Sequence, residues 1–210
     1  GALMGCAITT AMGVINNDAH LCIGESIVIF GAGGVGLSMI QFAAMVGGYP
    51  IVAIDLHKNK LELAKRLGAT HMLNAKTDNI EAEIRKIVGF PGADVSIENT
   101  GLADVIELAY NVTSARGRTI LVGVPPVNAR HPSFYTLPLH FEKIIKGSEG
   151  GGCRPEFDIP KLERVYRAGK LRFEDLVSTR RPLDQINAAI EDLRNGRVAG
   201  RAILNMGGTP

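Results

Sequence analysis

The sequence predicts an α/β protein in which a doubly wound parallel sheet is the middle of three αβα layers. Short β-branched runs alternate with longer segments of helical periodicity between residues 26 and 123. Strands and helices that alternate in this way form a parallel sheet covered on both faces. A glycine-rich turn, Gly31-Ala32-Gly33-Gly34-Val35-Gly36, directly follows the first of these runs. Such a turn is typical of the first strand-to-helix connection in this fold class.

The first part of the chain supplies five strands and four helices. The run Ser26-Ile27-Val28-Ile29-Phe30 is almost wholly apolar, as expected for a strand buried on both faces. The helix that starts at Lys58 has a polar face and is closed by Gly68, a common residue just past a helix. By the same criteria we expect strands at 26–30, 51–55, 71–74, 93–98 and 118–123, and helices at 35–47, 58–68, 78–88 and 103–113.

The pattern changes after Pro125-Pro126. We expect an extended segment at 131–137, a sixth strand at 143–147, a flexible break at Gly150-Gly151-Gly152, amphipathic helices at 155–169 and 182–195, and a short last strand at 201–205. Residues 26–150 are therefore interpreted as one doubly wound domain. Residues 1–25 form a helical lead-in to it, and residues 151–210 pack back on it.

Composition excludes several classes of function. The 23 basic and 21 acidic residues leave a net charge of +2 without a basic stripe, so we expect neither nucleic acid nor membrane as a partner. Every apolar run is shorter than the ~20 residues of a membrane span. The three cysteines, Cys6, Cys22 and Cys153, form no CxxC pair, which argues against a zinc knuckle or a disulfide framework. We expect a cytoplasmic protein.

The glycine-rich turn predicts a dinucleotide site, because it follows a strand and opens a helix. Gly31 permits the tight turn, and Gly33 lets the backbone approach a pyrophosphate. Gly36 allows the helix to pack closely on the strand, while the helix start at Gly34 offers free N–H groups to phosphate oxygens. The alternative is a strand-to-helix turn that binds nothing.

Asp55 ends the second predicted strand, nineteen residues after Gly36. An acidic side chain at this place accepts hydrogen bonds from the ribose hydroxyls of the adenosine half and repels a 2′-phosphate. The sequence therefore favours NAD over NADP. Lys58 and Lys60 lie close by and would soften that preference, and a helix cap is the alternative role for Asp55.

Motifs along nearly the whole chain resemble one family. They are Gly5-Cys6, Thr9-Thr10-Ala11-Met12-Gly13, the turn at 31–38, Asp55, the VGVPP segment at 122–126, residues 158–162 and Gly200-Arg201-Ala202-Ile203-Leu204. Together they resemble the zinc-dependent alcohol dehydrogenases of the medium-chain dehydrogenase/reductase superfamily. The resemblance implies a Rossmann NAD(P)-binding domain, preceded in the family by a GroES-like catalytic domain to which the lead-in would connect. That catalytic domain holds most of the zinc site.

The resemblance also assigns roles to individual positions. Cys6 matches one ligand of the catalytic zinc, but a single cysteine builds no site, so we expect this chain alone to lack zinc and to be inactive. Roles in cofactor binding are implied for Thr10 and Val35 at the nicotinamide ring, Val122 and Val124 at its carboxamide, Lys60 near the adenosine ribose, Arg201 at the pyrophosphate, and Asn99, Thr100 and Gly101 in the loop between the two halves. For Arg201 the alternative is a surface arginine. The segment Glu149-Gly150-Gly151-Gly152 departs from the family pattern.

For the whole enzyme, the resemblance implies hydride transfer between an alcohol and NAD, with zinc acting on the alcohol oxygen. It also implies a homodimer joined near residues 131–147. Three other interpretations stay open. They are a zinc-free, NADPH-dependent quinone or enoyl reductase, a non-catalytic nucleotide-binding module, and a methyltransferase. The first needs neither Asp55 nor Cys6, and the last does not account for the VGVPP segment.

Overall fold

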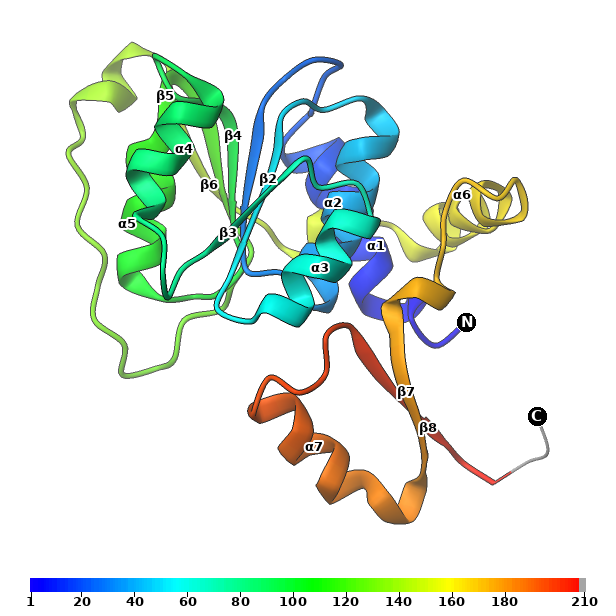
Figure 1. The fold of residues 1–210 in the computed structure, drawn as a ribbon. Coiled ribbons are helices and arrows are strands. Elements are labelled where there is room, and N and C mark those ends of the chain that lie inside the picture. The colour runs from blue at the N-terminus through cyan, green and yellow to red at the C-terminus, as the bar shows by residue number, and fades with distance from the viewer. Residues whose placement is uncertain (208–210) are drawn as a thin grey trace.

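The computed structural model describes residues 1–207, and its centre is a six-stranded parallel sheet (Figure 1). The strand order is β3-β2-β1-β4-β5-β6, so the direction of winding reverses between β1 and β4. The doubly wound fold is therefore confirmed. The strands are β1 Ile27–Phe30, β2 Ile51–Asp55, β3 His71–Asn74, β4 Ala93–Glu98, β5 Thr113–Leu121 and β6 Ile144–Gly147.

Helices cover both faces of this sheet because alternate side chains of each strand point to opposite sides. Ile27 and Ile29 of β1 belong to one apolar core, while Val28 and Phe30 belong to the other. The first core packs under α1, α2 and α3, and the second under α4 and α5, as Figure 1 shows on its right and left sides. The helices are α1 Thr9–Gly13, α2 Gly34–Val46, α3 Lys58–Arg66, α4 Ile80–Val88 and α5 Ala103–Val112.

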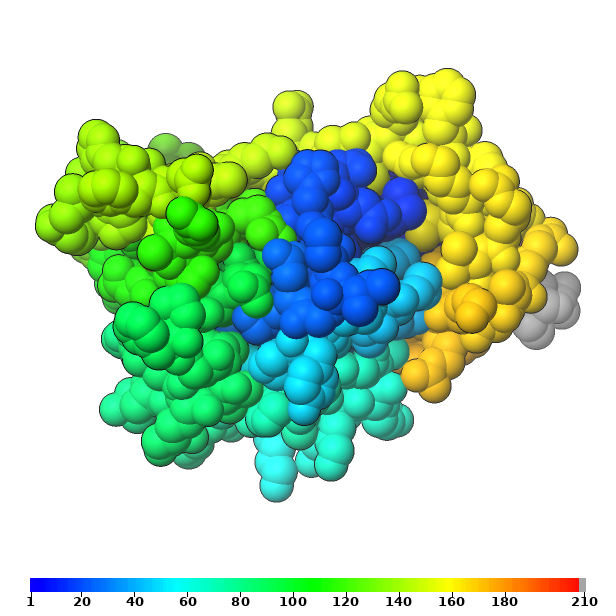
Figure 2. All heavy atoms as spheres, turned by 90° about the horizontal axis from the view of Figure 1, so that it is seen from above, coloured from blue at the N-terminus to red at the C-terminus, as the bar shows by residue number. Residues whose placement is uncertain are grey.

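Residues 4–18 of the N-terminal lead-in are helical. A π-helical turn at Met4–Ile8, then α1, then a second π-helical turn at Val14–Asp18 run on without a break. From above, the N-terminal segment lies in the middle of the surface, with the chain around α6 beside it (Figure 2). Arg118 of β5 fastens its far end, since the guanidinium donates to the carbonyl oxygen of Ala19 and pairs with Glu25 at 2.6 Å. The lead-in is thereby part of the sheet's core packing.

The long connection from β5 to β6 contains no strand before residue 144. The segment 131–137 is irregular, and a 3₁₀ turn at Leu137–Phe141 precedes β6. Two contacts hold the connection against α5. The hydroxyl of Tyr110 donates to the carbonyl oxygen of Tyr135 at 2.9 Å, and the ammonium of Lys143 donates to the carbonyl oxygens of Tyr110 and Thr113.

The C-terminal part differs from the prediction in one element. A strand, β7 Val177–Pro182, lies between the two expected helices and pairs in parallel with β8 Arg201–Asn205. The prediction of a single last strand was therefore wrong. The remaining elements are α6 Pro155–Arg167, a 3₁₀ turn at Glu174–Leu176, a second at Leu183–Gln185, and α7 Ile186–Arg194. The second helix thus begins at Ile186 rather than at residue 182.

Two smaller corrections concern backbone conformation. The fifth strand begins at Thr113 rather than at Arg118, directly after α5. The glycines at 150–152 form a packed turn rather than a flexible break, with φ of 57°, 72° and 57°. A Cβ on Gly151 would lie 2.6 Å from the carbonyl oxygen of Thr10, so this turn rests directly on α1. Within residues 1–207, no helix combines the length and apolar character of a membrane span.

Candidate functional site

The glycine-rich turn has the backbone that its sequence predicts. Gly31 follows β1 with a φ of 95°, a conformation that side chains other than glycine rarely adopt. A Cβ on Gly36 would lie 1.9 Å from the carbonyl oxygen of Gly31, so only glycine lets α2 start this close to the strand. A Cβ on Gly33 would point into open space. The turn therefore leaves an uncovered approach to the first turn of α2.

Beside this opening, the side chain of Arg201 covers Gly34, although 167 positions separate the two residues. A Cβ on Gly34 would come within 1.9 Å of the Arg201 Nε atom. This Nε is buried and has no hydrogen-bond partner among residues 1–207. No side chain caps α2, and its first turn carries no acidic residue. The guanidinium of Arg201 thus lies beside the uncapped start of α2, and a cationic group and free helix N–H groups placed together both favour an anion next to them.

Asp55 ends β2 beside the same turn. One carboxylate oxygen accepts a hydrogen bond from Ala32 N and the other from His57 N, both at 2.9 Å. The Lys60 ammonium lies 3.7 Å from the first of these oxygens. Asp55 is buried, so these contacts tie the glycine-rich turn to the residue just before α3. α3 begins without a side-chain cap, because Asp55 accepts from the N–H of His57, the residue before the helix, so the helix-capping alternative for Asp55 is wrong. Each carboxylate oxygen still has a lone pair for a further donor.

A cavity of about 310 Å³ opens beside Asp55, and we call it the Asp55 pocket. Lys60 and Thr100 line it together with apolar side chains from β2, α4 and α5. The full lining is Phe30, Gly31, Ile54, Asp55, Leu56, His57, Lys60, Ala75, Ile80, Thr100, Leu102, Val105 and Leu108. An apolar slot with a few polar groups at its edge suits a flat heterocycle with a polar substituent.

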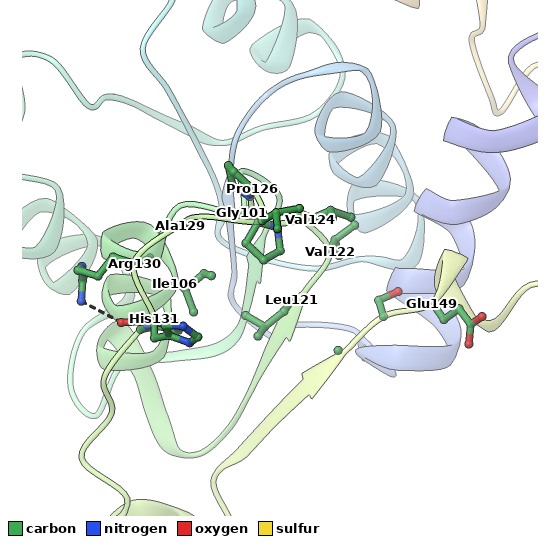
Figure 3. Close-up of a pocket in the computed structure, with 17 residues that line it drawn as sticks. Gly101, Ile106, Leu121, Val122, Val124, Pro126, Ala129, Arg130, His131 and Glu149 are labelled. Carbon is green, nitrogen blue, oxygen red and sulfur yellow. Dashed lines mark hydrogen bonds between the residues drawn. The ribbon is translucent and has the colours of Figure 1, made fainter.

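A second cavity of about 690 Å³ lies beyond the ends of β5 and β6 (Figure 3), and we call it the Val124 pocket. Its lining is Gly101, Ala103, Ile106, Leu121, Val122, Gly123, Val124, Pro125, Pro126, Val127, Ala129, Arg130, His131, Pro132, Gly147, Ser148 and Glu149. Gly101, Val122 and Val124, which were assigned from different parts of the sequence, meet in this pocket.

Ion pairs hold the segment that forms the outer wall of the Val124 pocket. Arg130 pairs with Glu107 at 2.8 Å and with Asp104, both on α5, and donates to the His131 carbonyl oxygen. The hydrogen bond to Glu107 raises the pKa of Arg130, and the guanidinium holds the pKa of Glu107 below its usual value. The 126–132 segment is thus fastened to α5 by one arginine.

Asn99, Thr100 and Gly101 form the loop that separates the two pockets. Thr100 borders the Asp55 pocket and Gly101 borders the Val124 pocket. Glu98, directly before this loop, is fully buried and was not singled out from the sequence. The sequence carries no distinguishing signal for it, because the same strand, Ala93–Glu98, also contains the charged Asp94 and the polar Ser96.

The lead-in carries the remaining candidates. Thr10 is half-buried on α1 against the turn at 150–152, and Val35 is half-buried at the start of α2, packed on the core below it. Cys6 is exposed. Across the described chain, 1–207, no three His, Cys, Asp or Glu side chains come together as metal ligands. Burial raises the pKa of the other nearby thiol, Cys153, which donates to the Thr9 carbonyl oxygen.

Comparison with known proteins agrees with this geometry. Residues 34–164 match the family model described as zinc-binding dehydrogenase. The chain is 32% identical to the NDMA-dependent alcohol dehydrogenase of Amycolatopsis methanolica, over 93% of this chain and 53% of that protein. It is 31% identical to the S-(hydroxymethyl)glutathione dehydrogenase of Paracoccus denitrificans, over 96% of this chain and 55% of that protein.

Among solved structures, the benzyl alcohol dehydrogenase of Acinetobacter calcoaceticus superposes with a TM-score of 0.91 at 33% identity, covering 98% of this chain and 56% of that one. The chain spans about half the length of the curated relatives it matches. The family-model match, residues 34–164, contains the second half of the glycine-rich turn, Asp55 and the loops of both pockets. The chain belongs to the zinc-binding dehydrogenase family, and its fold is that family's cofactor-binding Rossmann domain.

Proposed function

We propose that this chain binds NAD across the crevice where the sheet reverses direction and holds it for hydride transfer in a zinc-dependent alcohol dehydrogenase. The observation that carries the proposal is the buried Nε of Arg201, which has no partner within residues 1–207 and lies over Gly34 at the start of α2. A buried donor without an acceptor costs free energy, and a diphosphate at this place would satisfy it.

Different residues bind different parts of the cofactor. Arg201 and the N–H groups of the turn, at Gly33, Gly34 and Gly36, hold the diphosphate. Asp55 and Lys60 receive the adenosine ribose at the mouth of the Asp55 pocket, and the apolar walls of that pocket accept the adenine. The carboxylate of Asp55 would lie against a 2′-phosphate, which is why we propose NAD rather than NADP.

The nicotinamide half extends toward the Val124 pocket. Backbone groups of Val122 and Val124 fix the carboxamide, and Thr10 and Val35 limit the ring on the side of α1 and α2. When bound, the nicotinamide supplies the carbon that accepts or donates the hydride. None of these side chains is an acid or base, so the contribution of this chain is to bind and orient the cofactor.

The residues of this chain do not fit a catalytic zinc by themselves. Such a site needs three protein ligands and an open position, whereas Cys6 is exposed and no metal-ligating cluster exists in the described part of the chain. A ligand role for Cys6 is proposed only for an enzyme whose other residues complete the site. An alcohol is the substrate class that the named relatives suggest.

We also propose that the protein is a homodimer joined along β6. Tyr135, Leu137, Phe141 and Ile144 expose apolar side chains on or just before this edge strand. An edge strand with exposed apolar neighbours favours pairing with a second copy. Sedimentation at micromolar concentration should give the dimer mass, and a purely monomeric species would refute this proposal.

Titration with NADH and NADPH, followed by nicotinamide fluorescence, tests the main proposal. We expect saturable NADH binding, with a lower affinity for NADPH. Failure to bind either dinucleotide would contradict the cofactor role, and a preference for NADPH would contradict the role of Asp55.

A further inference from the structure

A fully buried carboxylate, Glu98, lies at the end of β4 between the two pockets. One of its oxygens accepts hydrogen bonds from the backbone N–H and the hydroxyl of Thr100. Gly101 N donates to both oxygens, at 3.0 and 3.1 Å. A buried carboxylate persists only where donors surround it, and here all of these donors come from one loop.

The backbone of Glu98 holds the neighbouring loop. Its carbonyl oxygen accepts from Val122 N at 2.8 Å and from Gly123 N at 3.0 Å. The two loops also touch directly, because a Cβ on Gly123 would lie 2.2 Å from Gly101 N. One residue therefore sets the position of the 99–101 loop through its side chain and of the 122–124 turn through its main chain.

These two loops bound different halves of the crevice. Thr100 lines the Asp55 pocket, and its methyl group lies 3.2 Å from where a Cβ on Gly31 would be, so it also rests on the glycine-rich turn. Gly101 and Val122 line the Val124 pocket. The spacing between the pockets thus depends on the loop that the Glu98 carboxylate fixes.

The negative charge at Glu98 is needed for this arrangement. A carboxylate accepts through two oxygens, whereas a glutamine side chain accepts through one and presents N–H donors at the other position. With glutamine there, the amide N–H of Gly101 would face a second donor. Gly101 has a φ of 75°, and because glycine moves freely between such conformations, no backbone strain opposes a shift of the loop once this contact is weakened.

We propose that Glu98 is a positioning residue that fixes the distance between the two subsites, so that both halves of one dinucleotide bind together. The inference rests on the proposed dinucleotide function. It assigns to Glu98 no contact with the cofactor, and it predicts that ligands spanning both pockets depend on Glu98 more than ligands confined to one.

The test compares E98Q with a control of similar burial elsewhere, I84A, whose side chain is fully buried on α4 in the second core. NADH, which would span both pockets, and AMP, which would fill only the Asp55 pocket, are titrated after circular dichroism has verified that each variant is folded. For E98Q we expect the Kd of NADH to rise about tenfold, the size typical of lost hydrogen bonds to a charged acceptor, and that of AMP to change less than about threefold. The fluorescence enhancement of bound NADH should fall as well. I84A should melt earlier while both affinities are unchanged.

T100V is the second variant, in case E98Q does not fold. This variant keeps Glu98 and the shape of the residue-100 side chain but removes the hydroxyl donor. The Kd of NADH should therefore rise, as in E98Q, but only by about two- to threefold. If the variants lose affinity for NADH and AMP equally, or if they bind NADH as tightly as the wild type does, the positioning role is overturned. If the wild-type protein binds no NADH, the proposed function fails first and this inference with it.

Discussion

Replacing Arg201 by methionine should separate stability from binding, because the two effects have opposite signs. In the free protein the Nε of Arg201 is buried without a partner among residues 1–207. A buried unpaired donor costs about 1–3 kcal/mol, so Arg201→Met should leave the free energy of unfolding unchanged or raise it by about 1 kcal/mol. Methionine keeps an unbranched apolar stem for the surface that the arginine covers.

Binding should change in the other direction. Hydrogen bonds that a charged group makes are worth about 1.5–3 kcal/mol, which corresponds to a rise in the Kd of NADH of about 10- to 150-fold. Fluorescence titration measures the affinity, and urea unfolding of the ligand-free protein measures the stability. Wild-type affinity should also fall more steeply with added salt than that of Arg201→Met.

A matched control lies on the neighbouring strand. Arg180 on β7 is exposed, and Arg180→Met removes the same charge from the same small sheet without touching the glycine-rich turn. We expect it to bind NADH as the wild type does. The reasoning is refuted if Arg201→Met binds NADH normally, or if it loses more than about 2 kcal/mol of stability in the absence of ligand.

Three further predictions concern other positions. Asp55→Ser should weaken the binding of NADH about tenfold and the binding of NADPH by less. An equal loss of affinity for both dinucleotides in titrations would show that Asp55 serves only to connect the turn to α3. Burial lowers the pKa of Lys143 to about 8, from 10.5. Between these two values Lys143 is protonated in the unfolded chain and neutral in the folded protein. The free energy of unfolding should therefore rise with pH across that window, by on the order of 2 kcal/mol, in the wild type but not in Lys143→Met. Urea unfolding that shows the same pH dependence for both proteins would contradict this. Gly151→Ala should destabilise by about 1–3 kcal/mol more than Gly150→Ala, because both have positive φ but only the first Cβ meets the Thr10 carbonyl oxygen; equal melting temperatures would count against the packed turn.

Most of the central fold could be predicted because its signals are local. The first two strands of the main sheet, β1 and β2, are short and almost wholly apolar runs, and the turn at Gly31 needs glycine for reasons within a few residues of it. The strand β7 was missed because Val177–Pro182 lacks a run of apolar residues and none of its residues is fully buried, and its partner β8 begins 19 residues beyond its end. Such a pair is stabilised by pairing across the chain rather than by local pattern.

In the candidate site, too, the features with local signals were predicted and those that depend on distant contacts were not. The glycine-rich turn and Asp55 are recognisable from spacing alone, since strand, turn and helix are consecutive in the sequence. Glu98 was not found, because a glutamate at the end of a strand is uninformative until the donors around it are known. The turn at 150–152 was expected to be flexible from composition, and its packing depends on α1, about 140 residues earlier.

The sequence by itself determined the doubly wound sheet, the glycine-rich turn and the acidic residue beside it, because periodicity and glycine spacing act over a few residues. Only the tertiary structure decided that Arg201 lies over Gly34 and that Glu98 holds two loops at once. It also decided that Asp55, Lys60 and Thr100 line one pocket while Gly101, Val122 and Val124 line another. The physical reason is that burial and hydrogen-bond partners are properties of groups brought together from distant parts of the chain. Burial and hydrogen bonds contribute free energy only when the folded sheet has brought those groups together.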